Sequence, residues 1–304
     1  MAKWSTIAPL HYWDRTRLLT SGFSFTNDCS LSPTPAWLRS KETLDRVSDK
    51  ASTWIKDSSV SIVVEYEATS AGDLDPNWQG KPPRTKEAWA TELIYLVYFS
   101  LWLSHPTEMT FSSMILAGKP EDKWLYVWHN DFSTIQSIPK DVPAVLSQAD
   151  LELAKSILSS LRSLENSHSV WLAVRVILQA QEQDWWEGRY LFYWVALEAL
   201  FGPDSSREIT YRLATRAAFF LSKNPDERKQ IFQSVKEGYE SRSAVVHGMR
   251  IDKLTPEKSQ TILQNTEDIA RRSLLRILTE PGLMEMFQKK RREAYLDDLI
   301  FKTS

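Results

Sequence analysis

Trp185-Trp-Glu-Gly-Arg-Tyr-Leu-Phe-Tyr-Trp-Val-Ala-Leu-Glu-Ala-Leu-Phe201 is the stretch of this sequence that decides its fold class. Most of its residues are apolar or aromatic, and the pair Gly202-Pro203 that follows is typical of a helix end. The stretch therefore predicts a very apolar helix. Such a helix is stable only where neighbouring elements cover it, so it indicates a helical bundle.

The sequence on both sides of this stretch carries the patterns of further helices. Thr255-Pro256-Glu257 combines a cap residue, a proline at the first helical position and an acidic first turn. The other predicted helices cover 147–164, 169–183, 206–222, 226–246, 255–278 and 283–301. We therefore predict that residues 146–304 form an α-helical domain.

Residues 1–145 have a different character. Residues 59–67 alternate and are β-branched, which predicts a strand, while 109–116 and 124–128 are weaker strand candidates and 85–104 resembles a helix. Most of the 13 tryptophans lie in this part of the chain. Their side chains could fill the core of a small domain or stack on nucleic-acid bases, and packing in the core is the favoured role. We predict a smaller mixed α+β domain of unassigned role here, and a mainly α fold for the whole chain of 304 residues.

The composition excludes several classes of protein. A net charge of −2 argues against an overall basic field for nucleic acid, so any such binding would use local patches. The single cysteine, Cys29, excludes a disulfide framework and a cysteine-based zinc site, and no GxxxxGK loop is present. The longest apolar stretch, 93–103, is too short to cross a bilayer, and the N-terminus lacks a secretory pattern. We expect a cytoplasmic protein with no membrane partner, metal or cofactor.

The stretch Tyr239-Glu-Ser-Arg-Ser-Ala-Val-Val-His-Gly248 places an arginine and a histidine five positions apart near a predicted helix end. Arg242 carries a planar cationic fork suited to phosphate, and His247 can exchange a proton near neutral pH. The spacing alone is a weak signal, since Arg162 and His168 nearly repeat it. On a regular helix, two residues five positions apart point about 140° away from each other. The two side chains can therefore converge only if the long arginine side chain reaches across, if the helix end departs from regular geometry, or if each pairs with the other residue of a second copy of the chain. The alternative is a terminal histidine that interacts with the helix dipole.

Three motifs in order carry a resemblance to a known family. They are Trp194-Val-Ala-Leu-Glu198, then Glu208-Ile-Thr-Tyr-Arg212, then Tyr239-Glu-Ser-Arg-Ser-Ala-Val-Val-His-Gly248. This order resembles the Apea-like branch of the HEPN superfamily (higher eukaryotes and prokaryotes nucleotide-binding domains). The resemblance covers about residues 185–248.

The resemblance implies a helical bundle that dimerises through the motif helices. It also implies a metal-independent endoribonuclease of the kind found in toxin–antitoxin and antiviral defence systems. Arg242 and His247 match the R-x4-6-H motif and would be the catalytic residues. Ser243 stands where Asn, Asp or His is more usual in the wider superfamily, a departure that is normal for this branch.

Four further residues are candidate members of the site. Glu198 is a carboxylate among apolar neighbours and needs a cationic partner, for which Arg242, Arg212 and Arg216 are candidates. Arg212 and Arg216 lie one helical turn apart and either contact RNA phosphates or form an internal salt-bridge set with Glu198 or Glu208. Tyr239 either stacks on a base or packs with its hydroxyl at the surface.

Two basic clusters are weaker candidates for contact with an RNA backbone. The first is Arg271-Arg272 with Arg276, and the second is Lys289-Lys-Arg-Arg292. Acidic residues lie close to both clusters, so solvated helix faces are the favoured interpretation.

Two functions stay open at this point. The first is an endoribonuclease that leaves 2′,3′-cyclic phosphate and 5′-OH ends, with RNA, a second copy of the chain and an antitoxin or defence-system protein as partners. The second is a non-catalytic HEPN module that binds RNA or a nucleotide, or that serves as a dimerising adaptor.

Overall fold

The computed structural model describes residues 2–12, 22–70, 72–77, 84–106, 109–110, 113–117, 125–129, 146–164, 169–183, 185–203, 208–246, 255–288 and 291–302. The chain divides into two compact units, Met1–Leu158 and Ser159–Ser304. The division falls inside helix α4 (Gln148–Arg162), whereas the sequence pattern places a boundary between residues 145 and 146. Each unit is described by itself.

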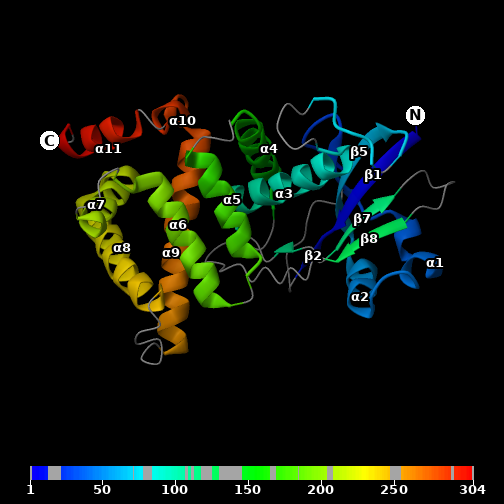
Figure 1. Cartoon of the computed structure of the whole chain (residues 1–304), viewed down its shortest axis with the longest axis horizontal. Helices are drawn as coiled ribbons and strands as arrows, with labels where there is room; N and C mark the ends of the chain where they lie inside the picture. The colour runs from blue at the N-terminus through cyan, green and yellow to red at the C-terminus, as the bar shows by residue number, and fades with distance from the viewer. Residues whose placement is uncertain are drawn as a thin grey trace. The chain divides into compact units, whose positions relative to one another are not determined.

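The first unit contains an antiparallel sheet, drawn as arrows in Figure 1. Among the described residues its six strands have the order β3-β4-β5-β1-β7-β8, and β2 pairs with β6 in a separate ribbon. The strands are β1 (Ala2–Pro9), β2 (His11–Tyr12), β3 (Phe23–Ser24), β4 (Cys29–Pro33), β5 (Val60–Ala68), β6 (Met109–Thr110), β7 (Ser113–Ala117) and β8 (Leu125–His129). The strands predicted at 59–67 and 124–128 are therefore confirmed, with shifted ends. The single strand predicted at 109–116 is wrong in its extent, because this stretch supplies β6 to the separate ribbon and β7 to the six-stranded sheet.

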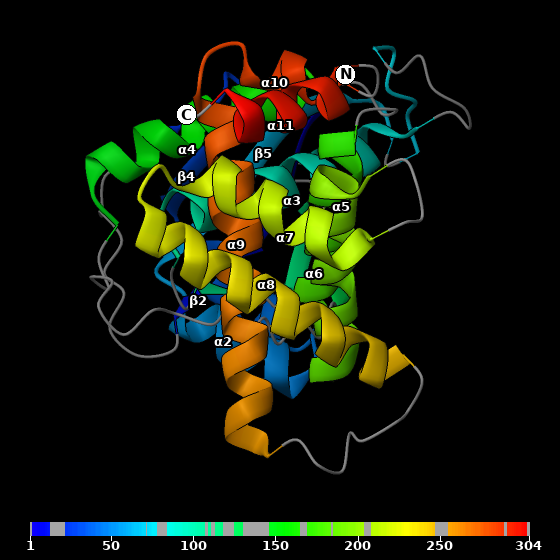
Figure 2. The ribbon, with the colours of Figure 1, turned by 90° about the vertical axis from the view of Figure 1, so that its left-hand side faces the viewer.

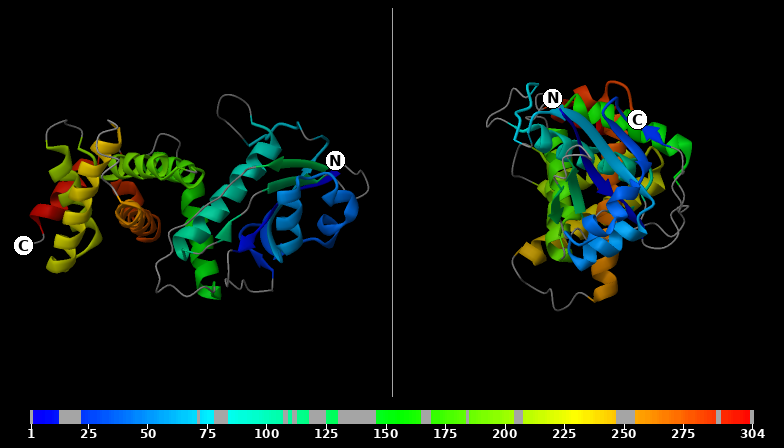
Figure 3. Two further views of the ribbon diagram at one scale, coloured as in Figure 1. Left: turned by 90° about the horizontal axis from the view of Figure 1, so that it is seen from below. Right: turned by 90° about the vertical axis from the view of Figure 1, so that its right-hand side faces the viewer.

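Helices cover both faces of this sheet (Figure 3). On one face, Ile7 of β1 packs with Leu38 and Ile55, which lie on η1 (Ala36–Arg39) and α2 (Asp49–Asp57). On the other face, Tyr66 of β5 meets Trp89 of α3 at a ring distance of 6.2 Å. The helices of this unit are η1, α1 (Lys41–Leu44), α2 and α3 (Lys86–Ser104), followed by α4.

The second unit is helical. Its helices are α5 (Ser169–Gln181), α6 (Trp186–Phe201), α7 (Ile209–Leu221), α8 (Pro225–Val246), α9 (Pro256–Thr279), α10 (Leu283–Met286) and α11 (Arg292–Phe301). The apolar stretch 185–201 forms α6. Thr255 caps α9 by accepting a hydrogen bond from the backbone N–H of Lys258. The mainly α fold with a smaller α+β part is therefore confirmed.

One predicted helix is wrong in its extent. Residues 283–301 were expected to form a single helix, but the structure has the two short helices α10 and α11 instead. Phe287 lies between them with its side chain fully buried against the rings of Phe201 and Phe220, at 6.3 and 5.3 Å. Insertion of this ring into the core accompanies the break.

The helices of the second unit pack as neighbouring pairs. α5 packs on α6, α7 on α8, and α9 contacts α6, α7 and α8. Figure 2 shows α8 crossing α6 and α9. Tyr190, Tyr193 and Trp194 of α6 are buried at the centre of this packing. Within the described residues, no helix combines the length and apolar character needed to cross a membrane.

Candidate functional site

Arg242 of α8 and Glu198 of α6 form an ion pair. Arg242 Nη2 lies 3.5 Å from Glu198 Oε1, and the two side chains are 29% and 31% exposed. Of the three arginines that the sequence offers as partners of Glu198, namely Arg242, Arg212 and Arg216, the structure pairs Arg242 with it. Because both groups reach solvent, the pair contributes little stability and serves mainly to orient the guanidinium.

Tyr239 lies beside this ion pair. Its ring meets the Trp194 ring edge-on at 5.4 Å and 86°, and Arg242 Cζ lies 5.5 Å from the centre of the Tyr239 ring. That placement fits a cation–π contact. Burial raises the pKa of Tyr239 and the Glu198 carboxylate raises it further, while Arg242 opposes them. The phenol therefore stays protonated and can donate a hydrogen bond.

Gly238 lets α8 approach α6 at this point. A Cβ added at Gly238 would lie 2.6 Å from Trp194 Cζ2, closer than carbon atoms can pack. The Tyr190 hydroxyl donates a hydrogen bond to the Gly238 carbonyl, and burial raises the pKa of Tyr190 to about 12. Gly238 and Tyr190 are not among the site residues predicted from the sequence. The available signal was a glycine inside a helical pattern, which costs helix stability unless close packing requires it.

Of the remaining motif residues Ser243 and His247, the structure describes only Ser243. Ser243 is exposed on α8, the residue after Arg242. The described part of α8 ends at Val246, and His247 lies outside the described residues. His168, the histidine of the second Arg–His spacing, also lies outside them. The proximity of Arg242 and His247 therefore stays a prediction.

Arg216 is a buried structural cation. Its side chain is 1% exposed, Nη1 lies 3.1 Å from Glu293 Oε1, and Nη2 lies 2.9 Å from Asp297 Oδ1. Nη1 also donates to the carbonyl of Phe201 at 3.3 Å. In this arrangement its guanidinium is enclosed by protein groups, so it does not face an RNA phosphate.

Arg212 shares one of these carboxylates. Its Nη2 lies 4.0 Å from Glu293 Oε1, and its side chain is 30% exposed. From the sequence, a salt-bridge set with Glu198 or Glu208 is one of the two roles open to these arginines. The structure shows a salt-bridge set whose acids, Glu293 and Asp297, come from α11 instead.

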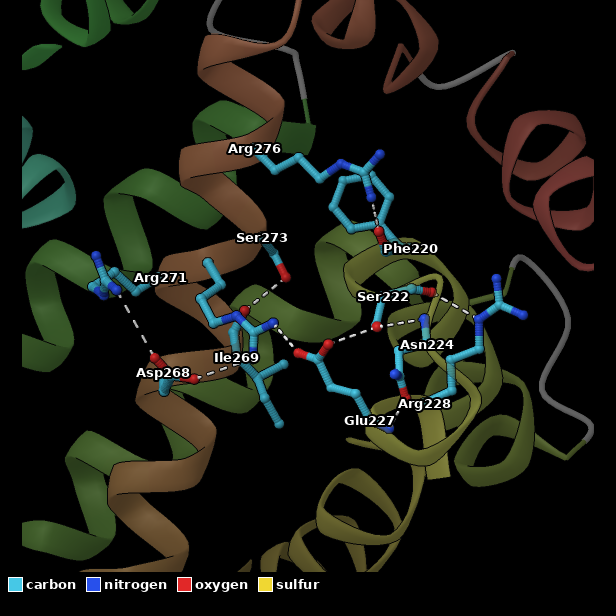
Figure 4. Close-up of polar contacts among 11 residues, drawn as sticks. Phe220, Ser222, Asn224, Glu227, Arg228, Asp268, Ile269, Arg271, Ser273 and Arg276 are labelled. Carbon is cyan, nitrogen blue, oxygen red and sulfur yellow. Dashed lines mark hydrogen bonds and ion pairs between the residues drawn. The ribbon is translucent and has the colours of Figure 1, made fainter. Parts of the chain in front are cut away.

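The basic cluster on α9 also makes internal contacts (Figure 4). Arg272 Nη2 lies 2.6 Å from Glu227 Oε1 of α8, and Arg271 and Arg272 both approach Asp268, at 3.9 and 3.6 Å. The Ser222 hydroxyl donates to Glu227 Oε2 at 2.6 Å, which extends the contact into the α7–α8 turn.

Arg276 continues this cluster along α9. It donates to the carbonyl of Phe220, its Cζ lies 4.8 Å from the centre of the Phe220 ring, and its Nε lies 2.7 Å from Glu280 Oε1. The cluster thus holds α9 against α7 and α8. These contacts indicate that Arg271, Arg272 and Arg276 stabilise the helix packing rather than form a surface that binds an RNA backbone.

The described residues contain no group of three or more His, Cys, Asp or Glu side chains placed to hold a metal ion. Comparisons with family models, with curated proteins and with solved structures found no match to this chain.

Proposed function

We propose that the chain is a metal-independent endoribonuclease of HEPN type, which acts in the cytoplasm as a toxin or an antiviral defence effector. The observation that carries the proposal is the setting of Arg242. Its guanidinium is part-exposed, oriented by Glu198 at 3.5 Å and bordered by the Tyr239 ring, five positions before His247 in the chain. Cleavage of an RNA phosphodiester without a metal needs a proton-transferring group and a cation that stabilises charge on the phosphate oxygens, and a histidine and an arginine can supply these.

The chemistry would be attack of a ribose 2′-OH on the adjacent phosphate. Neutral His247 takes the proton of the 2′-OH, and a protonated histidine gives one to the leaving 5′ oxygen. Arg242 stabilises the negative charge that develops on the phosphate oxygens. The products are a 2′,3′-cyclic phosphate and a 5′-OH end, and DNA is not cleaved because it lacks the 2′-OH.

The neighbouring side chains support this chemistry in different ways. Glu198 orients the guanidinium of Arg242, and a phosphate that binds must compete with this carboxylate. Tyr239 presents a protonated phenol and a ring face next to the cation, which suits stacking on a base beside the scissile phosphate. Ser243 is exposed beside Arg242 and can donate a hydrogen bond to the same phosphate.

The proposed partners are RNA, a second copy of the chain and an antitoxin or defence-system protein that restrains the activity. The exposed Val195 of α6 and Val246 of α8 lie on the two helices that carry Glu198 and Arg242. We propose that a second copy covers these residues and that the two Arg–His pairs then act on one phosphate.

Cleavage assays on purified protein test the proposal. We expect the EDTA-treated protein to cleave RNA, to leave 2′,3′-cyclic phosphate ends and to spare a DNA of the same sequence. His247→Ala should lower the rate by about 10²- to 10⁴-fold, the usual contribution of a positioned acid or base. His168→Ala is the matched control, because His168 belongs to the second Arg–His spacing, and it should cleave at the wild-type rate. Undiminished cleavage by His247→Ala would contradict the proposal.

A second function, a non-catalytic HEPN module that binds RNA or a nucleotide or that serves as a dimerising adaptor, is favoured by one observation. Glu198 already neutralises Arg242, which weakens the attraction of Arg242 for a phosphate transition state. Binding of RNA by the wild type without any cleavage in EDTA would favour this module.

A further inference from the structure

The last turn of α6 determines where Glu198 points. The backbone N–H of Gly202 donates to the Glu198 carbonyl at 2.8 Å and closes this turn. A Cβ added at Gly202 would collide with the same carbonyl, so this turn requires a glycine at position 202. The position of the Glu198 carboxylate, and with it the orientation of Arg242, therefore depends on what holds the end of α6.

Two arginines hold this end of α6. Arg292 donates from Nη1 to the Ala199 carbonyl and from Nη2 to the Gly202 carbonyl, the latter at 3.1 Å. Arg216 donates from Nη1 to the Phe201 carbonyl at 3.3 Å. The last carbonyls of a helix have no partners within the helix, so guanidinium donors satisfy groups that water or a cap would otherwise have to meet.

Both arginines depend on α11. Arg292 is the first residue of α11 and is 9% exposed. Arg216 comes from α7, but its charge is balanced by Glu293 and Asp297 of α11. A buried guanidinium without a carboxylate is strongly destabilising, so Arg216 keeps its place at the end of α6 only while α11 is docked.

We propose that the C-terminal helix α11 positions the candidate site, with Arg292 and Arg216 as positioning residues that act on Arg242 through Glu198. The inference rests on the proposed function, because it concerns the same site. Undocking of α11 would leave Arg242 chemically intact but would release the turn that orients it.

The test compares two adjacent arginines. Arg292→Met removes both carbonyl contacts and keeps the side-chain bulk, whereas Arg291→Met changes an arginine whose side chain is 59% exposed and whose nearest carboxylate is 3.7 Å away. We expect Arg292→Met to lower kcat for RNA cleavage by about 10- to 100-fold with little change in KM, since small misplacements of catalytic groups act on the reacting geometry. Arg291→Met should leave both parameters unchanged. Equal kinetics in the two variants would overturn the proposal.

A double-variant comparison separates positioning from general loss of structure. If Arg292 acts through Glu198, then Arg292→Met should add little to the effect of Glu198→Gln, because coupled residues are not additive. Losses that multiply in the double variant would overturn the proposal. If Arg292→Met fails to fold, Arg292→Lys, which keeps the charge but not the two-carbonyl geometry, takes its place in the same comparison.

A spectroscopic readout keeps the test independent of cleavage. The pKa of the Tyr239 phenol responds to Glu198 and Arg242, and it can be followed by NMR with tyrosine labelled at Cζ, assigned with Tyr239→Phe. We expect Arg292→Met to change this pKa and Arg291→Met to leave it alone. A chain without ribonuclease activity refutes the proposed function only, whereas an unchanged Tyr239 signal in Arg292→Met refutes the positioning role of α11.

Discussion

At the scale of single residues, Gly238 shows how a small side chain places the candidate site. It precedes Tyr239 and brings α8 close to the Trp194 ring of α6. The same approach lets Arg242, one turn later, reach Glu198. A larger residue at 238 would push α8 away and lengthen every contact between the two helices.

Gly238→Ala should therefore destabilise the protein. The added methyl meets Trp194 at 2.6 Å, and such overpacking costs about 1–3 kcal/mol, against a gain of about 1 kcal/mol in helix propensity. Gly188→Ala is the matched control, since its Cβ would meet the Gln183 side chain, with the nearest atom at 3.3 Å, and it should be neutral or stabilising. Urea unfolding measures both free energies. A Gly238→Ala variant as stable as Gly188→Ala would show that the helices are not in close contact here.

At the scale of elements, the sequence predicts helices well because their signals are local. Periodicity and caps place α4 to α9 within a few residues of their ends, as with the Thr255 cap of α9. Elements that depend on distant partners are not predictable in this way. β1 carries little alternation but pairs with β5 and β7, and the break between α10 and α11 accompanies burial of Phe287 against α6 and α7.

The start of α8 is anchored by a charge that should make stability depend on pH. Hydrogen bonds from Ser222 and Arg272 lower the pKa of Glu227. A lowered carboxyl pKa stabilises the folded state above the unfolded value, about 4.3, and this stability is lost as the pH falls through the lower folded value. Glu227→Gln should cost on the order of 0.5 kcal/mol at pH 7, because the ion pair is part-exposed, and the difference from wild type should shrink below about pH 4.

Unfolding free energies measured at pH 7 and pH 3 check this prediction. Glu240→Gln removes a carboxylate that is exposed on the same helix and serves as the control, with no pH-dependent loss expected. A Glu227→Gln penalty that is equal at both pH values would mean that the charge of Glu227 is not what anchors α8.

At the scale of the whole molecule, the candidate site joins residues that are distant in the chain. The sequence indicates that Glu198 needs a cationic partner, but only the packing of α6 against α8 selects Arg242 from three arginines. Likewise, the acids that enclose Arg216 are Glu293 and Asp297 of α11, which lie 77 and 81 residues away in the sequence, and no local signal marks them as its partners. Long-range pairing of this kind follows from the fold and not from spacing.

The spacing of Arg242 and His247 makes a prediction for the assembled protein. If the helix continued regularly to His247, the two side chains would point about 140° apart, and one copy of the chain would not stack them on one face. If two copies share a phosphate, an equimolar mixture of Arg242→Ala and His247→Ala should recover cleavage that neither variant shows alone, because a mixed dimer holds one intact arginine and one intact histidine. Arg242→Ala mixed with the Arg242→Ala/His247→Ala double variant is the control and should stay inactive, since no intact arginine remains. Lack of recovery in a mixture shown by mass spectrometry to contain mixed dimers would mean that each copy must supply both groups to its own phosphate.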